Sequence, residues 1–287
     1  MATTVYVNGR ISDARDAVVS VLDHGFLYGE GVYETLRTYN HRLFLFDRHA
    51  RRLRRSAGMI ALDLPFSDDD LLQAIMETMD SADLRDEAYV RVLVTRGIGE
   101  LTYDPKATPS HTLAIIVKPQ VDPPEAAYRD GVAVAIVDII RNHPGSVNPM
   151  IKSNNLMNNA LAMQEALRLG AFEGVMRNYR GELTECTTAN LFVVKSGSVL
   201  TPPLDAGILP GITREFIVEI GRAAGLDVRE AVLRDADLYG ADEAFLTSTT
   251  REAVPIVTVD RRTIGTGKPG PVTRKLLDEF RRVARTL

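Results

Sequence analysis

Short apolar stretches, separated by polar turn residues, mark β segments at the start of the chain. Residues 5–7 and 10–11 flank Asn8-Gly9, a pair suited to a tight hairpin turn because both residues accept a positive φ. A second pair of β segments is expected at residues 33–39 and 42–45, with a turn at the two polar residues between them, Asn40 and His41. The pattern therefore predicts two antiparallel hairpins in the first part of the chain.

Helical spacing follows between residues 47 and 60, where apolar residues recur three and four positions apart. Ser67 is placed to cap a second helix over residues 68–79. The strand predicted at residues 112–117 is nearly continuous in apolar residues, which predicts burial on both of its faces. The remaining predicted elements are strands at 88–95 and 131–140, short strands up to residue 201, a strand at 243–247, and helices at 157–169, 213–224 and 271–285.

A proline-rich segment interrupts these elements near the middle of the chain. Three prolines occur at residues 119–125, and proline continues neither a helix nor a central strand. We predict a linker there, between a small N-terminal α/β domain at residues 1–118 and a larger one at 126–287. The mixed order of helices and strands indicates an α+β fold and argues against a Rossmann nucleotide-binding domain.

Composition excludes several classes of function. The chain has 287 residues, of which 45% are hydrophobic and 25% charged, with a net charge of −4 and a pI near 5.8. These values give no electrostatic reason to expect binding to nucleic acid or to an anionic membrane. The sequence shows no secretory leader pattern and no apolar run of about 18 residues, so a cytoplasmic protein is expected. One cysteine, Cys186, allows no internal disulfide and no zinc site, and we expect it to be a small buried residue rather than a reactive thiol.

Lys152 is the first candidate for chemistry. The chain has 34 basic residues, only six of them lysines, and Lys152 directly follows Met150 and Ile151. A lysine in apolar surroundings can lose its proton and attack a carbonyl carbon, which an arginine cannot do. A surface lysine at the start of a helix is the competing interpretation.

Three segments in a fixed order carry a family resemblance: PMIKSNNL at 149–156, GELTECTTANLF at 181–192 and GILPGIT at 207–213. They resemble the class IV pyridoxal-phosphate aminotransferases, which include branched-chain and D-amino acid aminotransferases and aminodeoxychorismate lyase. The resemblance extends from about residue 5 to residue 271. It implies the fold-type IV architecture of two α/β domains, pyridoxal 5′-phosphate as cofactor, amino acids and 2-oxo acids as substrates, and a homodimer or higher homo-oligomer.

The resemblance also implies which residues hold the cofactor. Lys152 would bind it covalently and shuttle a proton, and Glu185 would keep its pyridine nitrogen protonated. The competing interpretation of Glu185 is an exposed turn glutamate, as Glu182 is expected to be. Gly211 precedes a predicted helix start, where backbone N–H groups and the helix dipole attract an anion. The other implied cofactor contacts are Arg52, Leu209, Ile212, Thr213, Ser248 and Thr249.

The substrate side is implied by Tyr28, Tyr33, Arg37, Tyr89, Arg91 and Thr250. Tyr89 and Arg91 are two apart on a predicted strand, so their side chains share one face. An arginine in so apolar a strand should have an anionic partner, either an internal glutamate or a substrate carboxylate. Tyr-x-Arg, and the loop at residues 95–101, resemble branched-chain aminotransferases, in which that loop closes the site of a neighbouring subunit.

Leu156 departs from this subgroup, because many branched-chain enzymes have tyrosine there and leucine is closer to D-amino acid aminotransferases. The Tyr-x-Arg pair and the loop at residues 95–101 still favour the branched-chain subgroup, so we expect transfer of an amino group from a branched-chain L-amino acid to 2-oxoglutarate by a ping-pong mechanism. A D-amino acid or (R)-amine aminotransferase is the first alternative, and an aminodeoxychorismate-type lyase that releases pyruvate is the second. A dimeric scaffold without catalytic activity is the third, and the complete set Lys152, Glu185, Arg52 and Thr213 argues against it.

Overall fold

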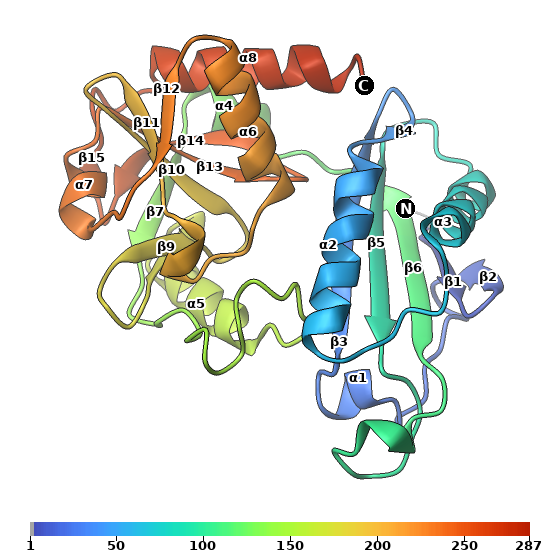
Figure 1. Cartoon of the computed structure of the whole chain (residues 1–287). Coiled ribbons are helices and arrows are strands. Elements are labelled where there is room, and N and C mark those ends of the chain that lie inside the picture. The colour runs from blue at the N-terminus through green and yellow to red at the C-terminus, as the bar shows by residue number, and fades with distance from the viewer. Residues whose placement is uncertain (1–2) are drawn as a thin grey trace. The chain divides into compact units, whose positions relative to one another are not determined.

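The computed structural model describes residues 3–287, which fold into two compact units (Figure 1). The first unit runs to Val121 and also contains residues 151–155 and Leu287; the second contains residues 122–150 and 156–286. The break after Val121 falls inside the proline-rich segment 119–125. Residues 151–155 were predicted to be part of the C-terminal domain, but in the structure they group with the first unit, because their backbone bonds to a strand of that unit.

The first unit is built on a six-stranded antiparallel sheet of order β2-β1-β6-β5-β3-β4. Two helices, α2 and α3, supply the apolar residues that complete the core against one face of this sheet (Figure 1). The elements are β1 (Thr4–Val7), β2 (Arg10–Asp13), α1 (His24–Leu27), β3 (Gly31–Tyr39), β4 (Arg42–Leu43), α2 (Phe46–Met59), α3 (Asp68–Ala82), β5 (Ala88–Thr95), η1 (Pro105–Ala107) and β6 (Thr112–Pro119).

Local sequence signals determine several of these elements. Asn8 and Gly9 have φ of 45° and 92°, as the predicted turn requires, and they join β1 to β2. Ser67 caps α3 in a capping box with Asp70: the side chain of each residue accepts a hydrogen bond from the backbone N–H of the other. Both hairpins and both helices predicted for this part of the chain are confirmed.

Burial alternates along the two central strands. In β5, Val90, Val92 and Val94 are buried against the helices, while the residues between them are half-buried. The prediction that residues 112–117 are buried on both faces is wrong, because β6 shows the same alternation and only one face is covered by helices. The other face of the sheet therefore remains available to polar side chains.

The second unit contains a nine-stranded mixed sheet of order β12-β11-β10-β13-β14-β7-β8-β9, with β15 paired to β14. β9 also pairs with β10, so the strands from β10 round to β9 close into a barrel. The elements are α4 (Glu125–Arg129), β7 (Val132–Ile136), α5 (Met157–Arg168), β8 (Glu173–Arg177), β9 (Leu183–Cys186), β10 (Asn190–Lys195), β11 (Ser198–Thr201), η2 (Leu204–Ala206), α6 (Ile212–Ala223), β12 (Asp227–Glu230), α7 (Asp235–Tyr239), β13 (Glu243–Ser248), β14 (Glu252–Val259), β15 (Arg262–Thr263) and α8 (Pro271–Ala284).

Two layers of apolar residues stabilise the second unit. One layer is formed by alternate residues of the strands, such as Leu191 and Leu246. The other lies on the opposite side of the same strands, where the rings of Phe192 and Phe245 stack with centroids 4.8 Å apart. The strand predicted at residues 131–140 is shorter than expected and ends at Ile136. The fold is thus α+β with two sheets, the fold-type IV arrangement that the resemblance implied.

Candidate active site

Lys152 lies at the edge of the sheet in the first unit. Its carbonyl oxygen accepts a hydrogen bond from Tyr33 N at 2.9 Å, and its own N–H donates to the hydroxyl of Ser56 at 3.1 Å. Ser153 forms an antiparallel bridge with Val32, so residues 152–154 continue the sheet beyond β3. These contacts fix the lysine backbone, and its side chain is half-buried rather than freely solvated.

Two cations lie close to the side chain of Tyr33. The Lys152 ammonium nitrogen is 4.3 Å from the centre of the tyrosine ring, and the Arg91 guanidinium carbon is 4.1 Å from it. An aromatic face attracts cations at such distances. The tyrosine therefore brings the predicted covalent lysine and a predicted substrate residue together.

Four of the residues predicted for the substrate side lie on one face of the first sheet. Arg37 pairs with Tyr89 across β3 and β5, and the register places Tyr33 and Arg91 on the same face. Within the described part of the chain, Arg91 has no ion pair with an internal carboxylate. Arg37 is buried, and its guanidinium lies 4.3 Å from the Tyr39 ring.

A buried group of charges occupies the opposite face of β3. Arg52 donates to Glu34 through Nε and Nη2, at 2.7 and 2.9 Å, and His49 donates from Nδ1 to the same carboxylate at 2.7 Å. Burial alone would raise the pKa of Glu34, but the charge of Arg52 and the hydrogen bonds from Arg52 and His49 hold that pKa well below its usual range. Burial lowers the pKa of His49, and the charge of Lys152 contributes to this lowering.

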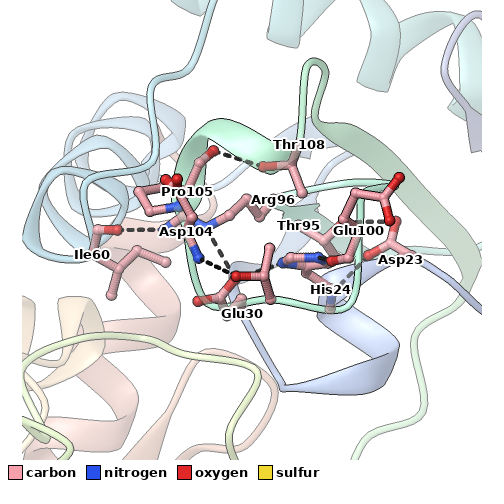
Figure 2. Close-up of polar contacts among 12 residues, drawn as sticks. Asp23, His24, Glu30, Ile60, Thr95, Arg96, Glu100, Asp104, Pro105 and Thr108 are labelled. Atoms are coloured by element: carbon pink, nitrogen blue, oxygen red, sulfur yellow. Dashed lines mark hydrogen bonds and ion pairs between the residues drawn. The ribbon is translucent and has the colours of Figure 1, made fainter.

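Tyr28, the last predicted substrate residue of the first unit, follows α1 and packs against the rings of His24 and Tyr103 at 4.9 and 5.0 Å. Figure 2 shows the polar network around His24. The two ring nitrogens of His24 lie 3.1 Å from the Glu30 carboxylate and 2.9 Å from the Glu100 carbonyl oxygen. Arg96 also donates to Glu30, at 3.0 Å. The network ties the loop at residues 96–111 to α1.

Glu185 lies in the second unit, where β9 meets β10. Its carboxylate accepts hydrogen bonds from Arg141 Nε at 2.9 Å, Asn190 Nδ2 at 3.1 Å and Leu209 N at 3.0 Å. Only 5% of Glu185 is exposed. Three donors, one of them a cation, favour the ionised form of the acid. Such an anion can hold a proton on a ring nitrogen.

The first turn of α6 carries the predicted helix-start residues Ile212 and Thr213, both buried. Its N-cap is Gly211, and no side chain of the described residues caps the helix. A Cβ at Gly211 would lie 1.8 Å from the Asn190 side-chain oxygen, so this close approach requires glycine. The free N–H groups of the first turn form a site suited to an anion.

The last residue of β13 and the turn after it contain the other predicted contacts, Ser248, Thr249 and Thr250. The hydroxyl groups of Thr247 and Ser248 are buried without a hydrogen-bond partner among the described residues. Buried hydroxyls without a protein partner are uncommon in folded proteins, and they can bind an ordered water or a polar ligand. An oxyanion such as phosphate supplies the acceptors that they lack.

Three further expectations concern Cys186, Glu182 and the absence of a metal site. Cys186 is buried as predicted, and burial together with the charges of Glu173 and Glu185 raises the pKa of its thiol well above the usual value. Glu182 was expected to be exposed but is buried, because Asn178 and Arg180 donate to its carboxylate.

Within residues 3–287, no group of side chains is arranged to hold a metal ion, and no helix is long and apolar enough to cross a membrane.

Four residues of the site were not predicted from the sequence: Glu34, His49, Arg141 and Asn190. A signal existed for Glu34, because it alternates with Val32 and Leu36 on the apolar side of β3 and a buried acid needs a cationic partner. No pattern distinguishes Arg141, which lies outside the strands and reaches Glu185 only through the fold.

Comparison with known proteins gives consistent matches. The profile of the family described as Amino-transferase class IV matches residues 31–259. A putative branched-chain-amino-acid aminotransferase of Methanocaldococcus jannaschii is 38% identical over 96% of this chain and 95% of that protein. A D-alanine aminotransferase of Bacillus licheniformis is 35% identical over 95% of this chain and 94% of that protein.

Solved structures give the same picture. A branched-chain amino acid aminotransferase of Thermobaculum terrenum, determined in its PLP form, superimposes with a TM-score of 0.88 at 29% sequence identity. The superposition covers 99% of this chain and 94% of that one.

Proposed function

This chain belongs to the class IV aminotransferases, and from that premise we propose that it moves the amino group of a branched-chain L-amino acid to 2-oxoglutarate. The cofactor is pyridoxal 5′-phosphate, and the two half-reactions alternate in a ping-pong sequence. The observation that carries the proposal is the cluster of Lys152, Tyr33 and Arg91. In this cluster, the half-buried amine of Lys152 and the guanidinium of Arg91 both lie close to the Tyr33 ring. Arg91 has no carboxylate partner among the described residues.

The residues present fit this cofactor. The start of α6, which no described side chain caps, and the hydroxyls of Thr247 and Ser248, which lack partners among the described residues, can receive a phosphate group. The ionised Glu185 can hold a proton on the pyridine nitrogen. We assign the phosphate to Ile212, Thr213, Ser248, Thr249 and Arg52, the ring to Glu185 and Leu209, and the covalent bond to Lys152.

Pyridoxal 5′-phosphate, when bound, withdraws electrons from the α-carbon of the amino acid. Lys152 contributes its amine, first as the point of covalent attachment. The freed amine is then the base that takes the proton from the α-carbon of the substrate and carries it to the cofactor carbon. Arg141, Asn190 and Leu209 keep Glu185 ionised and fixed in direction through their three hydrogen bonds. Arg91 supplies a positive charge for a carboxylate of the substrate.

The substrate assignment rests on the open face of β5. Tyr89 and Arg91 share that face, as the Tyr-x-Arg pattern of branched-chain enzymes requires. A D-amino acid aminotransferase is the second candidate, because Leu156 and the 35% identity to the D-alanine enzyme of Bacillus licheniformis favour it. Both candidates use the same cofactor residues.

Replacing Arg91 with alanine is expected to lower kcat/KM for 2-oxoglutarate and glutamate by roughly 10-fold to 100-fold, and kcat/KM for leucine by less than about threefold. The reason is that 2-oxoglutarate and glutamate carry a second carboxylate, which the guanidinium can bind, and leucine does not. The measurement is kcat/KM for each half-reaction with L-leucine, L-valine, L-glutamate, D-alanine and D-glutamate. Arg85→Ala, which changes an exposed arginine of the loop before β5, is the control.

The same panel decides the stereochemistry. We expect wild-type enzyme to react faster with L-leucine and L-valine than with either D-amino acid. Faster half-reactions with D-alanine would replace the branched-chain assignment with the D-amino acid one and leave the cofactor residues unchanged. Equal losses for leucine and glutamate in Arg91→Ala would reject the carboxylate role of Arg91.

We also propose that the enzyme is a homodimer, or a higher oligomer built from such dimers. Two adjoining segments of the first unit, held together by the network of Figure 2 and by an antiparallel bridge from Asp23 to Ile98, form an apolar surface. A contiguous surface of exposed apolar side chains is uncommon on monomeric proteins and is typical of a protein–protein interface. Its side chains are between 45% and 78% exposed: Val18, Val19, Val21, Leu22, Phe26, Ile98, Leu101 and Tyr103.

Changing Ile98 and Leu101 together to lysine is expected to convert the oligomer to monomer, because two charges would have to be buried in the interface. Sedimentation velocity across a range of concentrations gives the mass of the species in solution. Leu167→Lys is the control, since Leu167 is exposed on α5 and lies outside this surface. A monomeric wild-type enzyme, or a double variant that remains dimeric, would contradict the assignment.

A further inference from the structure

Glu34 is an acid in a position that the reaction described above does not use. It is 1% exposed and lies on β3 between Val32 and Leu36, two residues of the apolar core. A buried carboxylate is costly unless donors surround it. The three hydrogen bonds from Arg52 and His49 meet that need and keep it ionised.

The geometry of the pair with Arg52 is a fork. Both oxygens of Glu34 receive a nitrogen of the same guanidinium, Nε at 2.7 Å and Nη2 at 2.9 Å. Two parallel bonds fix the plane of the guanidinium as well as its position, which one bond or a point charge does not. Arg52 is buried on α2, whereas its neighbours Arg51 and Arg55 are exposed. The orientation of the Arg52 guanidinium is therefore determined by protein groups rather than by solvent.

His49 supports the acid from the next turn toward the start of α2. It donates Nδ1–H to Glu34, and its Nε2 is buried without a partner among the described residues. With its pKa lowered, mainly by burial, the imidazole is neutral near pH 7 and adds a hydrogen bond without adding a charge. The net charge of the group is therefore carried by Glu34 and Arg52 alone.

We propose that Glu34 is a positioning residue, which fixes the Arg52 guanidinium in the orientation that binds the cofactor phosphate. The inference rests on the proposed function, since it needs the phosphate of pyridoxal 5′-phosphate as the ligand of Arg52. Glu34 itself contacts neither the cofactor nor the substrate in this role. It acts only through Arg52, with His49 as its second support.

Two ligands separate this role from a general contribution to folding. Pyridoxal 5′-phosphate and pyridoxal differ only in the phosphate, so their affinity ratio measures what the phosphate contributes. We expect Glu34→Gln to weaken binding of the phosphorylated ligand about 10-fold or more and that of pyridoxal by less than about threefold. A glutamine places an amide NH₂ against one guanidinium nitrogen and so breaks the fork. Arg52→Lys should show the same pattern, and the double variant should lose little more than either single one.

The affinities are measured by equilibrium dialysis of the full chain, with circular dichroism to establish that each variant is folded. Glu34→Asp is the second variant; it keeps the charge with a shorter reach and should show a smaller, still phosphate-specific loss. Glu87→Gln is the matched control, because Glu87 accepts backbone N–H groups at the opposite end of β3 and stabilises the same unit. It should change neither affinity.

Each outcome is informative. Equal losses for both ligands in Glu34→Gln and Glu34→Asp, or no loss in either variant, overturn the positioning role while leaving the proposed function intact. Additive losses in the double variant overturn it as well, because Glu34 would then act independently of Arg52. Wild-type protein that binds neither ligand overturns the proposed function, and this inference with it.

Discussion

Replacing Lys152 with alanine is expected to reduce turnover at least about a thousandfold, because the amine serves both as the covalent attachment point and as the proton carrier. The variant should also lose the visible absorption of covalently bound cofactor. Alanine removes the side chain but leaves the backbone hydrogen bonds to Ser56 and Tyr33 in place, so the fold should persist. Steady-state rates and absorption spectra of the protein with added pyridoxal 5′-phosphate measure both effects.

Lys118→Ala is the matched control for this experiment. Lys118 also lies over a tyrosine ring of the first sheet, with its ammonium nitrogen 5.0 Å from the centre of Tyr89, but it is exposed. It should keep the spectrum and most of the rate. A cofactor bond in Lys152→Ala that borohydride still reduces would assign the covalent role to another lysine.

Glu185→Gln should retain bound cofactor and lose at least about a hundredfold in turnover, the scale of effect when an electrostatic contact in the transition state is removed. The amide keeps the shape of the acid but not its charge. In the variant, its NH₂ group faces a donor that bonds to a carboxylate oxygen in the wild-type protein, either Arg141 or Asn190. Arg141 is buried and would lose its ionised partner, so the free energy of unfolding should also fall by about 1 to 3 kcal/mol.

Rate and stability must therefore be measured separately, by pre-steady-state half-reactions and by chemical denaturation. Glu182→Gln is the control, because Glu182 is a second buried acid of the same region, held by Asn178 and Arg180. It should lower stability with little effect on turnover. If Glu185→Gln turned over at the wild-type rate, the role of Glu185 at the pyridine nitrogen would be rejected.

Local signals made much of the fold predictable. The Asn8-Gly9 turn, the Ser67 cap and the apolar spacing of α2 each act over a few residues, and each element formed where it was expected. The strand β14 was missed because Pro255 interrupts its pattern. In the structure, Pro255 pairs with Phe245 of β13, and the pairing with β7 begins only at Ile256. Tertiary context therefore tolerates a proline that local rules exclude.

The candidate site was predictable to the extent that its residues belong to motifs. Lys152, Glu185 and Thr213 each lie in a run that carries a family resemblance, whereas their supporting residues do not. Ser56 is 96 positions from Lys152 and Arg141 is 44 from Glu185, so only folding brings these pairs together. Glu34 was the one supporting residue that burial arguments could have identified.

The pairing of residues 151–155 with β3 has a consequence for fragments of this protein. The chain passes from one unit to the other after residues 121, 150, 155 and 286, so no single cut separates the units. A truncated chain ending at the linker would leave Tyr33 N and the Gly31 carbonyl oxygen without the partners that Lys152 and Asn154 provide. Such an unpaired strand edge promotes aggregation. Soluble expression of the N-terminal fragment would therefore require the short strand to be supplied, for example as a peptide or by circular permutation.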